Sequence, residues 1–153
     1  MSAGFGGPSP GHLLAERWGV PVRLEAQSVP TVRLADRLPI RGLSDAPLVV
    51  GIDALFWHAT DADCTRGLEA LDALLRAREG KPLILGTVPP IVAGQGCRAV
   101  LNAEMERRCT GHCILVRLEG DLLPTELHPG REWSERVLAR IYGIQARRAG
   151  GMG

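Results

Sequence analysis

Apolar residues fall into short runs that alternate with segments of helical spacing. Four runs predict strands, at residues 20–26, 47–53, 82–88 and 113–118. Those at 47–53 and 82–88 are almost continuously apolar, which is typical of strands buried on both faces. Strands separated by helices usually pair in parallel through right-handed crossovers. The pattern therefore predicts an α/β fold with a parallel sheet.

The segments between these runs are predicted to be helices, because their apolar side chains recur every three or four residues. Ser9-Pro10 suits the start of the first helix, and Asp61 or Asp63 is expected to cap the one that ends near Arg78. The predicted helices cover roughly residues 9–18, 31–38, 63–78, 97–109 and 133–141. In the helix at 97–109, Val100, Leu101 and Met105 are expected to face inward.

Length and composition fit one domain, which we place at residues 1–145, followed by a flexible, Gly-rich tail at 146–153. The net charge of +1 gives no electrostatic reason to expect nucleic acid as a partner. No apolar run is long enough to span a bilayer. The first ten residues lack the basic start and apolar stretch of a secretory signal. We therefore expect a cytoplasmic location for the chain as written. If residues precede Met1, the location is unknown.

Four cysteines are too few for a disulfide scaffold in a chain of this size. Cys109, His112 and Cys113 lie close together, but a structural zinc site needs four ligands and the sequence has no second cluster. The glycines at 4–7 lack the order and the Lys-Ser/Thr ending of a phosphate-binding loop. We expect core cysteines, no metal and no cofactor.

Ligands of open α/β sheets bind beyond the carboxyl ends of the strands. This rule selects four places: the loop at 28–31, the strand end at Asp53, the loop beginning at Thr87, and the loop that contains His128. The near-neutral pKa of histidine suits His128 as a general base; the alternative, which the spacing alone favours, is a surface histidine that packs beside Pro129 at the start of a helix. Asp53 is either a site carboxylate or a cap. We predict that His128, Asp53 and the 28–31 loop flank one crevice.

Several motifs, taken in chain order, carry a family resemblance. They are Met1-Ser2-Ala3-Gly4-Phe5-Gly6 at the start, Gly86-Thr87-Val88-Pro89-Pro90 after a predicted strand, Leu101-Asn102 within a predicted helix, and Leu127-His128-Pro129 before the last helix. Together they resemble the SGNH/GDSL serine hydrolases, over most of the chain from Ser2 to His128. The resemblance implies a flavodoxin-like three-layer α/β/α sandwich with a parallel sheet.

The resemblance also implies a chemistry. A serine attacks an ester carbonyl, and His128 takes the proton of that serine. The region that binds substrate or stabilises the oxyanion would include Ser28, Val29, Asp53 and Thr87. The partner would then be a small-molecule ester.

The chain departs from the family at several functional positions. The nucleophilic serine would lie immediately before Met1, and Val29, Ile52 and Thr125 replace a glycine, an asparagine and an aspartate of the family. We therefore expect an ester (acyl) hydrolase whose nucleophile lies upstream of Met1. The alternative is a catalytically inactive SGNH-like binding or scaffold domain.

The resemblance also leaves the first strand of the sheet missing. That strand would lie between those predicted at 20–26 and 47–53, and buried backbone groups without partners cost about 1–3 kcal/mol each. We expect a marginally stable chain that is prone to associate, and a homodimer is one way to fill the gap.

Overall fold

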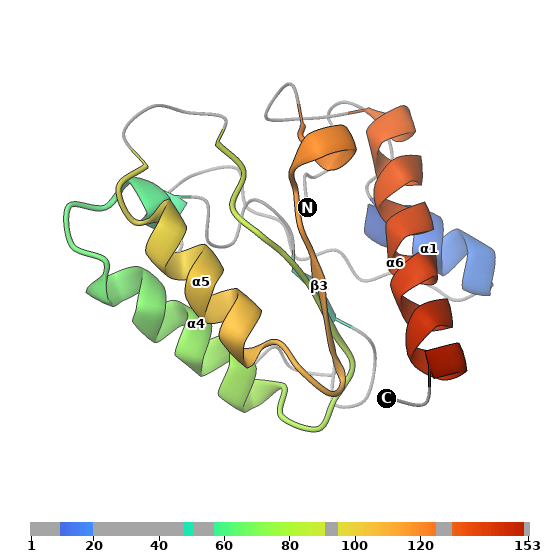
Figure 1. Ribbon diagram of the computed structural model, residues 1–153, viewed down its shortest axis with the longest axis horizontal. Helices are drawn as coiled ribbons and strands as arrows, with labels where there is room; N and C mark the ends of the chain where they lie inside the picture. Colours follow the sequence, from blue (N-terminus) through green and yellow to red (C-terminus); the bar gives the residue numbers. More distant parts are fainter. Residues whose placement is uncertain (1–9, 20–47, 51–56, 91–94, 125–129, 152–153) are drawn as a thin grey trace.

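The computed structural model describes residues 10–19, 48–50, 57–90, 95–124 and 130–151. Helices and strands alternate along these segments (Figure 1). In chain order the elements are α1 (Pro10–Trp18), β1 (Leu48–Val50), the 3-10 helix η1 (Trp57–Thr60), α4 (Thr65–Ala77), β2 (Leu83–Gly86), α5 (Arg98–Arg108), β3 (Cys113–Val116), the 3-10 helix η2 (Gly120–Leu122) and α6 (Arg131–Gly151).

The three described strands form one parallel sheet in the order β1-β2-β3. Leu48 pairs with Leu83 at one end of the ladder, and Gly86 pairs with Val116 at the other. The parallel α/β organisation is therefore confirmed for the strands predicted at 47–53, 82–88 and 113–118. The second and third are shorter than expected, and residues 47 and 51–53 of the first lie outside the described residues. The strand predicted at 20–26 lies outside the described residues.

Helices lie on both sides of this sheet (Figure 1). The crossover helices α4 and α5 pack against each other on one side. On the other side α6 packs against β3, and α1 packs across α6. An exposed ion pair between Arg17 and Glu135 joins α1 to α6. The result is a small parallel sheet with a helical layer on each face.

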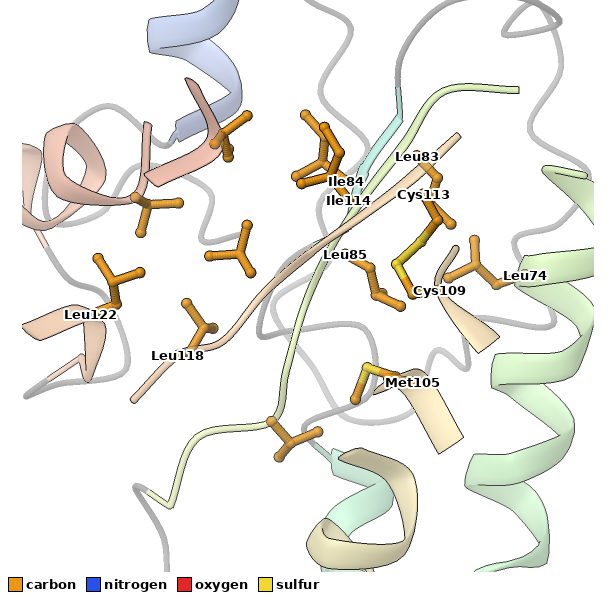
Figure 2. Close-up of a cluster of buried hydrophobic side chains, with 14 of the residues drawn as sticks. Leu74, Leu83, Ile84, Leu85, Met105, Cys109, Cys113, Ile114, Leu118 and Leu122 are labelled. Carbon is orange, nitrogen blue, oxygen red and sulfur yellow. A yellow bond between two sulfur atoms is a disulfide. The ribbon is translucent and has the colours of Figure 1, made fainter. Parts of the chain in front are cut away.

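The core follows the alternation of side chains along the strands. In β2, Leu83 and Leu85 point toward α4 and α5, whereas Ile84 points to the opposite face (Figure 2). All four residues of β2 are buried, as the continuous apolar run predicts. Leu71 and Leu74 supply the α4 stripe, and Val137, Leu138 and Ile141 supply that of α6.

Helix α5 corrects one expectation about the core. Leu101 and Met105 are fully buried, as predicted, but Val100 is 41% exposed. Residues four apart share a helical face, and Val100 is rotated about 100° from Leu101 around the axis. Val100 therefore points into solvent even though valine is apolar, as is its neighbour Leu101.

The ends of two helices also bear on the predictions. Helix α6 runs through Gly151 and so includes residues 146–151, most of the segment that we expected to be a flexible tail. Asp63 lies one residue before Cys64, the N-cap of α4. One oxygen of its carboxylate accepts hydrogen bonds from the backbone N–H of Thr65, the first residue of α4, at 3.0 Å and from the Thr65 hydroxyl at 2.7 Å.

The hydrogen bonds to the Asp63 carboxylate predict that the free energy of unfolding depends on pH. The two hydrogen bonds from Thr65 hold the pKa of the Asp63 carboxyl below its ordinary value. A lowered pKa in the folded state stabilises the fold above the ordinary pKa, and this stabilisation is lost as the pH falls through the folded-state pKa. Below about pH 4, unfolding free energies should therefore fall faster for the wild-type chain than for Asp63→Asn. Denaturant titrations between about pH 2 and 6 would measure this difference, with Glu69→Gln on the exposed face of α4 as the control. Parallel curves for the wild-type chain and Asp63→Asn would contradict the prediction.

Candidate functional site

The carboxyl ends of the three parallel strands lie along one edge of the sheet. Val50, Gly86 and Val116 are the last residues of β1, β2 and β3. The crossover helices α4 and α5 begin at this same edge, because each returns the chain to the amino edge for the next strand. This carboxyl edge is where an α/β protein of this type binds its ligands.

The loop at 87–90 is held firmly at the carboxyl edge by α5. The Val88 N–H donates to Asn102 Oδ1 at 2.8 Å, and Asn102 Nδ2 donates to the Val88 carbonyl at 3.0 Å. Arg98 Nε donates to the same carbonyl at 2.9 Å. Both backbone polar groups of the buried Val88 are thereby satisfied by side chains from the first two turns of α5.

Thr87 is the one expected site residue whose side chain is described. It is 9% exposed, and its hydroxyl accepts a hydrogen bond from the Leu118 N–H at 2.9 Å. The Thr87 N–H donates to the Val116 carbonyl at 3.0 Å. Thr87 thus joins the ends of β2 and β3 and holds the carboxyl edge together.

The other expected site residues lie outside the described residues. They are Ser28, Val29, Asp53 and His128. The common crevice for His128, Asp53 and the 28–31 loop therefore stays a prediction. By connectivity, the segment that contains His128 joins η2, which follows β3, to the first residue of α6.

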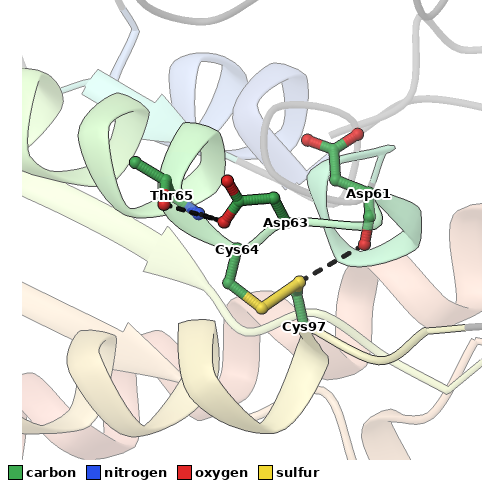
Figure 3. The surroundings of a disulfide bond; sticks show 5 residues. All are labelled: Asp61, Asp63, Cys64, Thr65 and Cys97. Atoms are coloured by element: carbon green, nitrogen blue, oxygen red, sulfur yellow. Dashed lines mark hydrogen bonds between the residues drawn. A yellow bond between two sulfur atoms is a disulfide. The ribbon is translucent and has the colours of Figure 1, made fainter.

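A disulfide bond lies at the carboxyl edge, although four cysteines are too few to predict a disulfide scaffold from the sequence. Cys64 immediately precedes α4, Cys97 immediately precedes α5, and their Cα atoms are 5.3 Å apart (Figure 3). Cys97 Sγ lies 3.5 Å from the Asp61 carbonyl oxygen. The disulfide thus ties together the beginnings of the two crossover helices.

A second disulfide lies at the opposite edge of the sheet. Cys109 directly follows α5 and Cys113 is the first residue of β3, with their Cα atoms 5.0 Å apart. These two cysteines are buried, as expected of core residues, but they are bonded to each other rather than reduced or available to a metal. Among the described residues, no group of three or more His, Cys, Asp or Glu side chains is placed to hold a metal ion.

Sequence reasoning missed the contribution of α5 to this edge. The signal was present: cysteines stand immediately before and immediately after the segment 98–108. Asn102 was noted only as part of a motif, and Arg98 was not singled out. A polar side chain near the start of a helix can reach the loop before that helix, so Arg98 and Asn102 were reasonable candidates for this role.

Comparison with known proteins adds no assignment. A scan against models of protein families gives no match for this chain, and searches among curated proteins and solved structures give none either. None of the described helices is long and apolar enough to cross a membrane.

The Asn102 contacts predict a loss of stability on substitution. Asn102→Leu keeps the side-chain size but leaves the buried Val88 N–H without an acceptor. The Val88 carbonyl still accepts the hydrogen bond from Arg98. A buried donor without a partner costs about 1–3 kcal/mol, so the free energy of unfolding should fall by about 2 kcal/mol. Guanidinium titration would measure it, with Ala103→Gln at the exposed neighbouring position as a control expected to change stability by less than about 0.5 kcal/mol. Equal effects at the two positions would show that the contact contributes nothing.

Proposed function

We propose that this chain has the flavodoxin-like sandwich of the SGNH serine hydrolases, and that the carboxyl edge of its sheet binds an ester. One observation carries the proposal. Two motifs of the resemblance, the Gly86 to Pro90 loop and Leu101-Asn102, contact each other through the paired hydrogen bonds between Asn102 and Val88. The resemblance was drawn from sequence alone, so this contact at the carboxyl edge is independent support.

The topology supports the same proposal. Three consecutive strands pair in parallel with their crossover helices on one side, while the first and last described helices pack together on the other. Helices divided in this way over the two faces are typical of doubly wound sheets, whose chain changes direction near the middle of the sheet. The ligand site of such a sheet lies at that point, beyond the carboxyl ends of the strands.

The proposed reaction is acyl transfer to serine followed by hydrolysis. His128 takes the proton from the attacking serine hydroxyl and returns it to the leaving alcohol, and then activates water to release the acid. Backbone N–H groups, that of Val29 among them, hold the negative oxygen of the tetrahedral intermediate. In the resemblance the nucleophilic serine aligns immediately before Met1. The role of Thr87 in this reaction is to fix the ends of β2 and β3, since its hydroxyl accepts from Leu118.

The test compares two chains in the hydrolysis of p-nitrophenyl acetate. One is residues 1–153, and the other is the same chain extended by the residues that the in-frame codons upstream of Met1 encode. The shorter chain should show no hydrolysis above its His128→Ala variant. The longer chain should hydrolyse the ester, and His128→Ala in it should lower the rate by about 10²–10⁴-fold, the usual contribution of a general base.

Three results would contradict the hydrolase proposal. Activity of the shorter chain that disappears in Ser2→Ala or Ser28→Ala would show that the nucleophile is misplaced. A longer chain that is active without His128 would remove the proposed base. A longer chain that folds, contains the aligned serine and neither hydrolyses the ester nor reacts with a fluorophosphonate would favour the alternative, a catalytically inactive binding or scaffold domain.

A further inference from the structure

The two disulfides lie at opposite ends of one helix, and the two ends differ electrostatically. Cys64–Cys97 joins the residues that precede α4 and α5, whereas Cys109 directly follows α5. The aligned peptide dipoles give a helix a partial positive charge at its N-terminus and a partial negative charge at its C-terminus. Thiolate is therefore favoured at Cys97 and disfavoured at Cys109.

The two disulfides also differ in access. Cys64 is half-buried at the surface of the carboxyl edge, and Cys97 behind it is 2% exposed. Cys109 and Cys113 are both buried. An external thiolate can therefore approach the sulfur of Cys64 far more readily than either sulfur of the second disulfide.

The surroundings of Cys97 further favour the reduced state of the first disulfide. Its Sγ lies 3.5 Å from the Asp61 carbonyl oxygen, an acceptor that a thiol can use and a disulfide sulfur cannot (Figure 3). The carboxylate of Asp63 precedes Cys64 in the chain and disfavours negative charge on the Cys64 sulfur. The positive charge of Arg98, which follows Cys97, favours Cys97 over Cys64 as the sulfur that leaves, and the protonated Cys97 thiol can then donate to the Asp61 carbonyl.

We propose that Cys64–Cys97 is a thiol–disulfide exchange site for dithiol reductants, and that Cys109–Cys113 is a permanent structural cross-link. A thiolate of the dithiol attacks Cys64 Sγ, the bond between the two protein sulfurs breaks, and its electron pair leaves on Cys97. The second thiolate of the reductant then attacks the reductant sulfur of the mixed disulfide, which closes a ring and releases Cys64 as a thiolate. The protein disulfide gains two electrons and two protons, and the dithiol becomes a cyclic disulfide.

Reduction has a structural consequence at the carboxyl edge. Arg98 and Asn102, in the first two turns of α5, hold the backbone N–H and carbonyl of Val88. Opening the disulfide frees the start of α5 from the start of α4 and loosens these contacts. The redox state of Cys64 and Cys97 is thereby transmitted to the loop at 87–90, whatever ligand that edge binds.

The experiment uses the full oxidised chain and increasing dithiothreitol at neutral pH. N-ethylmaleimide traps the free thiols, peptide mass spectrometry locates them, and far-UV circular dichroism follows the fold. Half-reduction of Cys64–Cys97 should require at least about tenfold less dithiothreitol than that of Cys109–Cys113, with the spectrum unchanged. In the partly reduced chain, hydrogen exchange at the Val88 amide and at 98–102 should accelerate, while that of β3 should not. Any of four results would overturn the proposal: free thiols in the untreated chain, reduction of both disulfides at the same dithiothreitol concentration, reduction of Cys109–Cys113 first, or reduction of Cys64–Cys97 only when the chain unfolds.

Two single variants test the direction of attack, with the second disulfide intact in both. Cys97→Ser leaves the half-buried Cys64 as a free thiol, and Cys64→Ser leaves the buried Cys97. Cys97→Ser should form a mixed disulfide with oxidised glutathione at least about tenfold faster than Cys64→Ser. Equal rates, or faster reaction of Cys64→Ser, would show that Cys64 is not the sulfur attacked.

Discussion

Replacing Cys64 and Cys97 together by alanine should lower the free energy of unfolding by about 4 kcal/mol under oxidising conditions. The two cysteines are 33 residues apart in the chain, so their bond closes a long loop and removes much of the conformational entropy of the unfolded state. The bond also links the beginnings of α4 and α5 in the folded state. Guanidinium titration of the wild-type and doubly substituted chains would measure the loss.

The second disulfide is the matched control for this prediction. Cys109 and Cys113 are only 4 residues apart, and the same chain-entropy relation gives about 2 kcal/mol for their replacement by alanine. Both double variants remove two sulfur atoms, so the volume lost is the same. Equal losses, or a larger loss at Cys109 and Cys113, would show that packing around the sulfurs outweighs loop closure. A loss near zero for Cys64 and Cys97 would show that the bond does not stabilise the fold.

The order of the described strands and α-helices could be predicted because local patterns determine them, whereas the short 3-10 helices η1 and η2 were not predicted. The continuous apolar runs became β1, β2 and β3, since each lies in a sheet with helices on both faces. The hydrogen bond from the first residue of α4 to the Asp63 carboxylate also followed from local rules. The exposure of Val100 was not predicted, because the sequence does not show how the helix is rotated about its axis. Without that rotation, an apolar residue next to the buried face cannot be distinguished from one on it.

The disulfides could not be predicted because pairing depends on distances across the fold. Cys64 and Cys97 belong to different crossover units, and only the packing of α4 on α5 brings their Cα atoms within 5.3 Å. The count of four cysteines pointed instead to a core role. For the same reason, the contact between Asn102 and Val88 emerged only once α5 was placed beside the loop after β2.

The oxidised cysteines bear on where the protein acts. Disulfides persist in oxidising compartments and are rare in a reducing cytosol, where those that occur are usually transient or redox-sensing. Cys64–Cys97 suits a redox-sensing role, but the buried Cys109–Cys113 bond suits a permanent cross-link. The cytoplasmic location that the sequence led us to expect stays a prediction.

Leu101→Ala should destabilise the chain by about 3–4 kcal/mol, which would place α5 among the elements on which the whole fold depends. Leu101 is fully buried on α5, in the same core cluster as Leu74, Leu85 and Met105. Because disulfides hold both ends of α5, the helix cannot shift readily to fill the cavity, and the cost should lie toward the upper part of the range for leucine truncations.

Val100→Ala is the matched control, one residue away on the same helix. Val100 is exposed, and alanine is the better helix former, so this change should leave the free energy of unfolding within about 0.5 kcal/mol of wild type or raise it slightly. Guanidinium titrations of both variants, followed by circular dichroism, would give the two values. A large loss for Val100→Ala with a small one for Leu101→Ala would mean that α5 is rotated about its axis from the orientation described. Asn102 would then no longer face Val88, and the contact on which the proposed hydrolase fold depends would be lost with it.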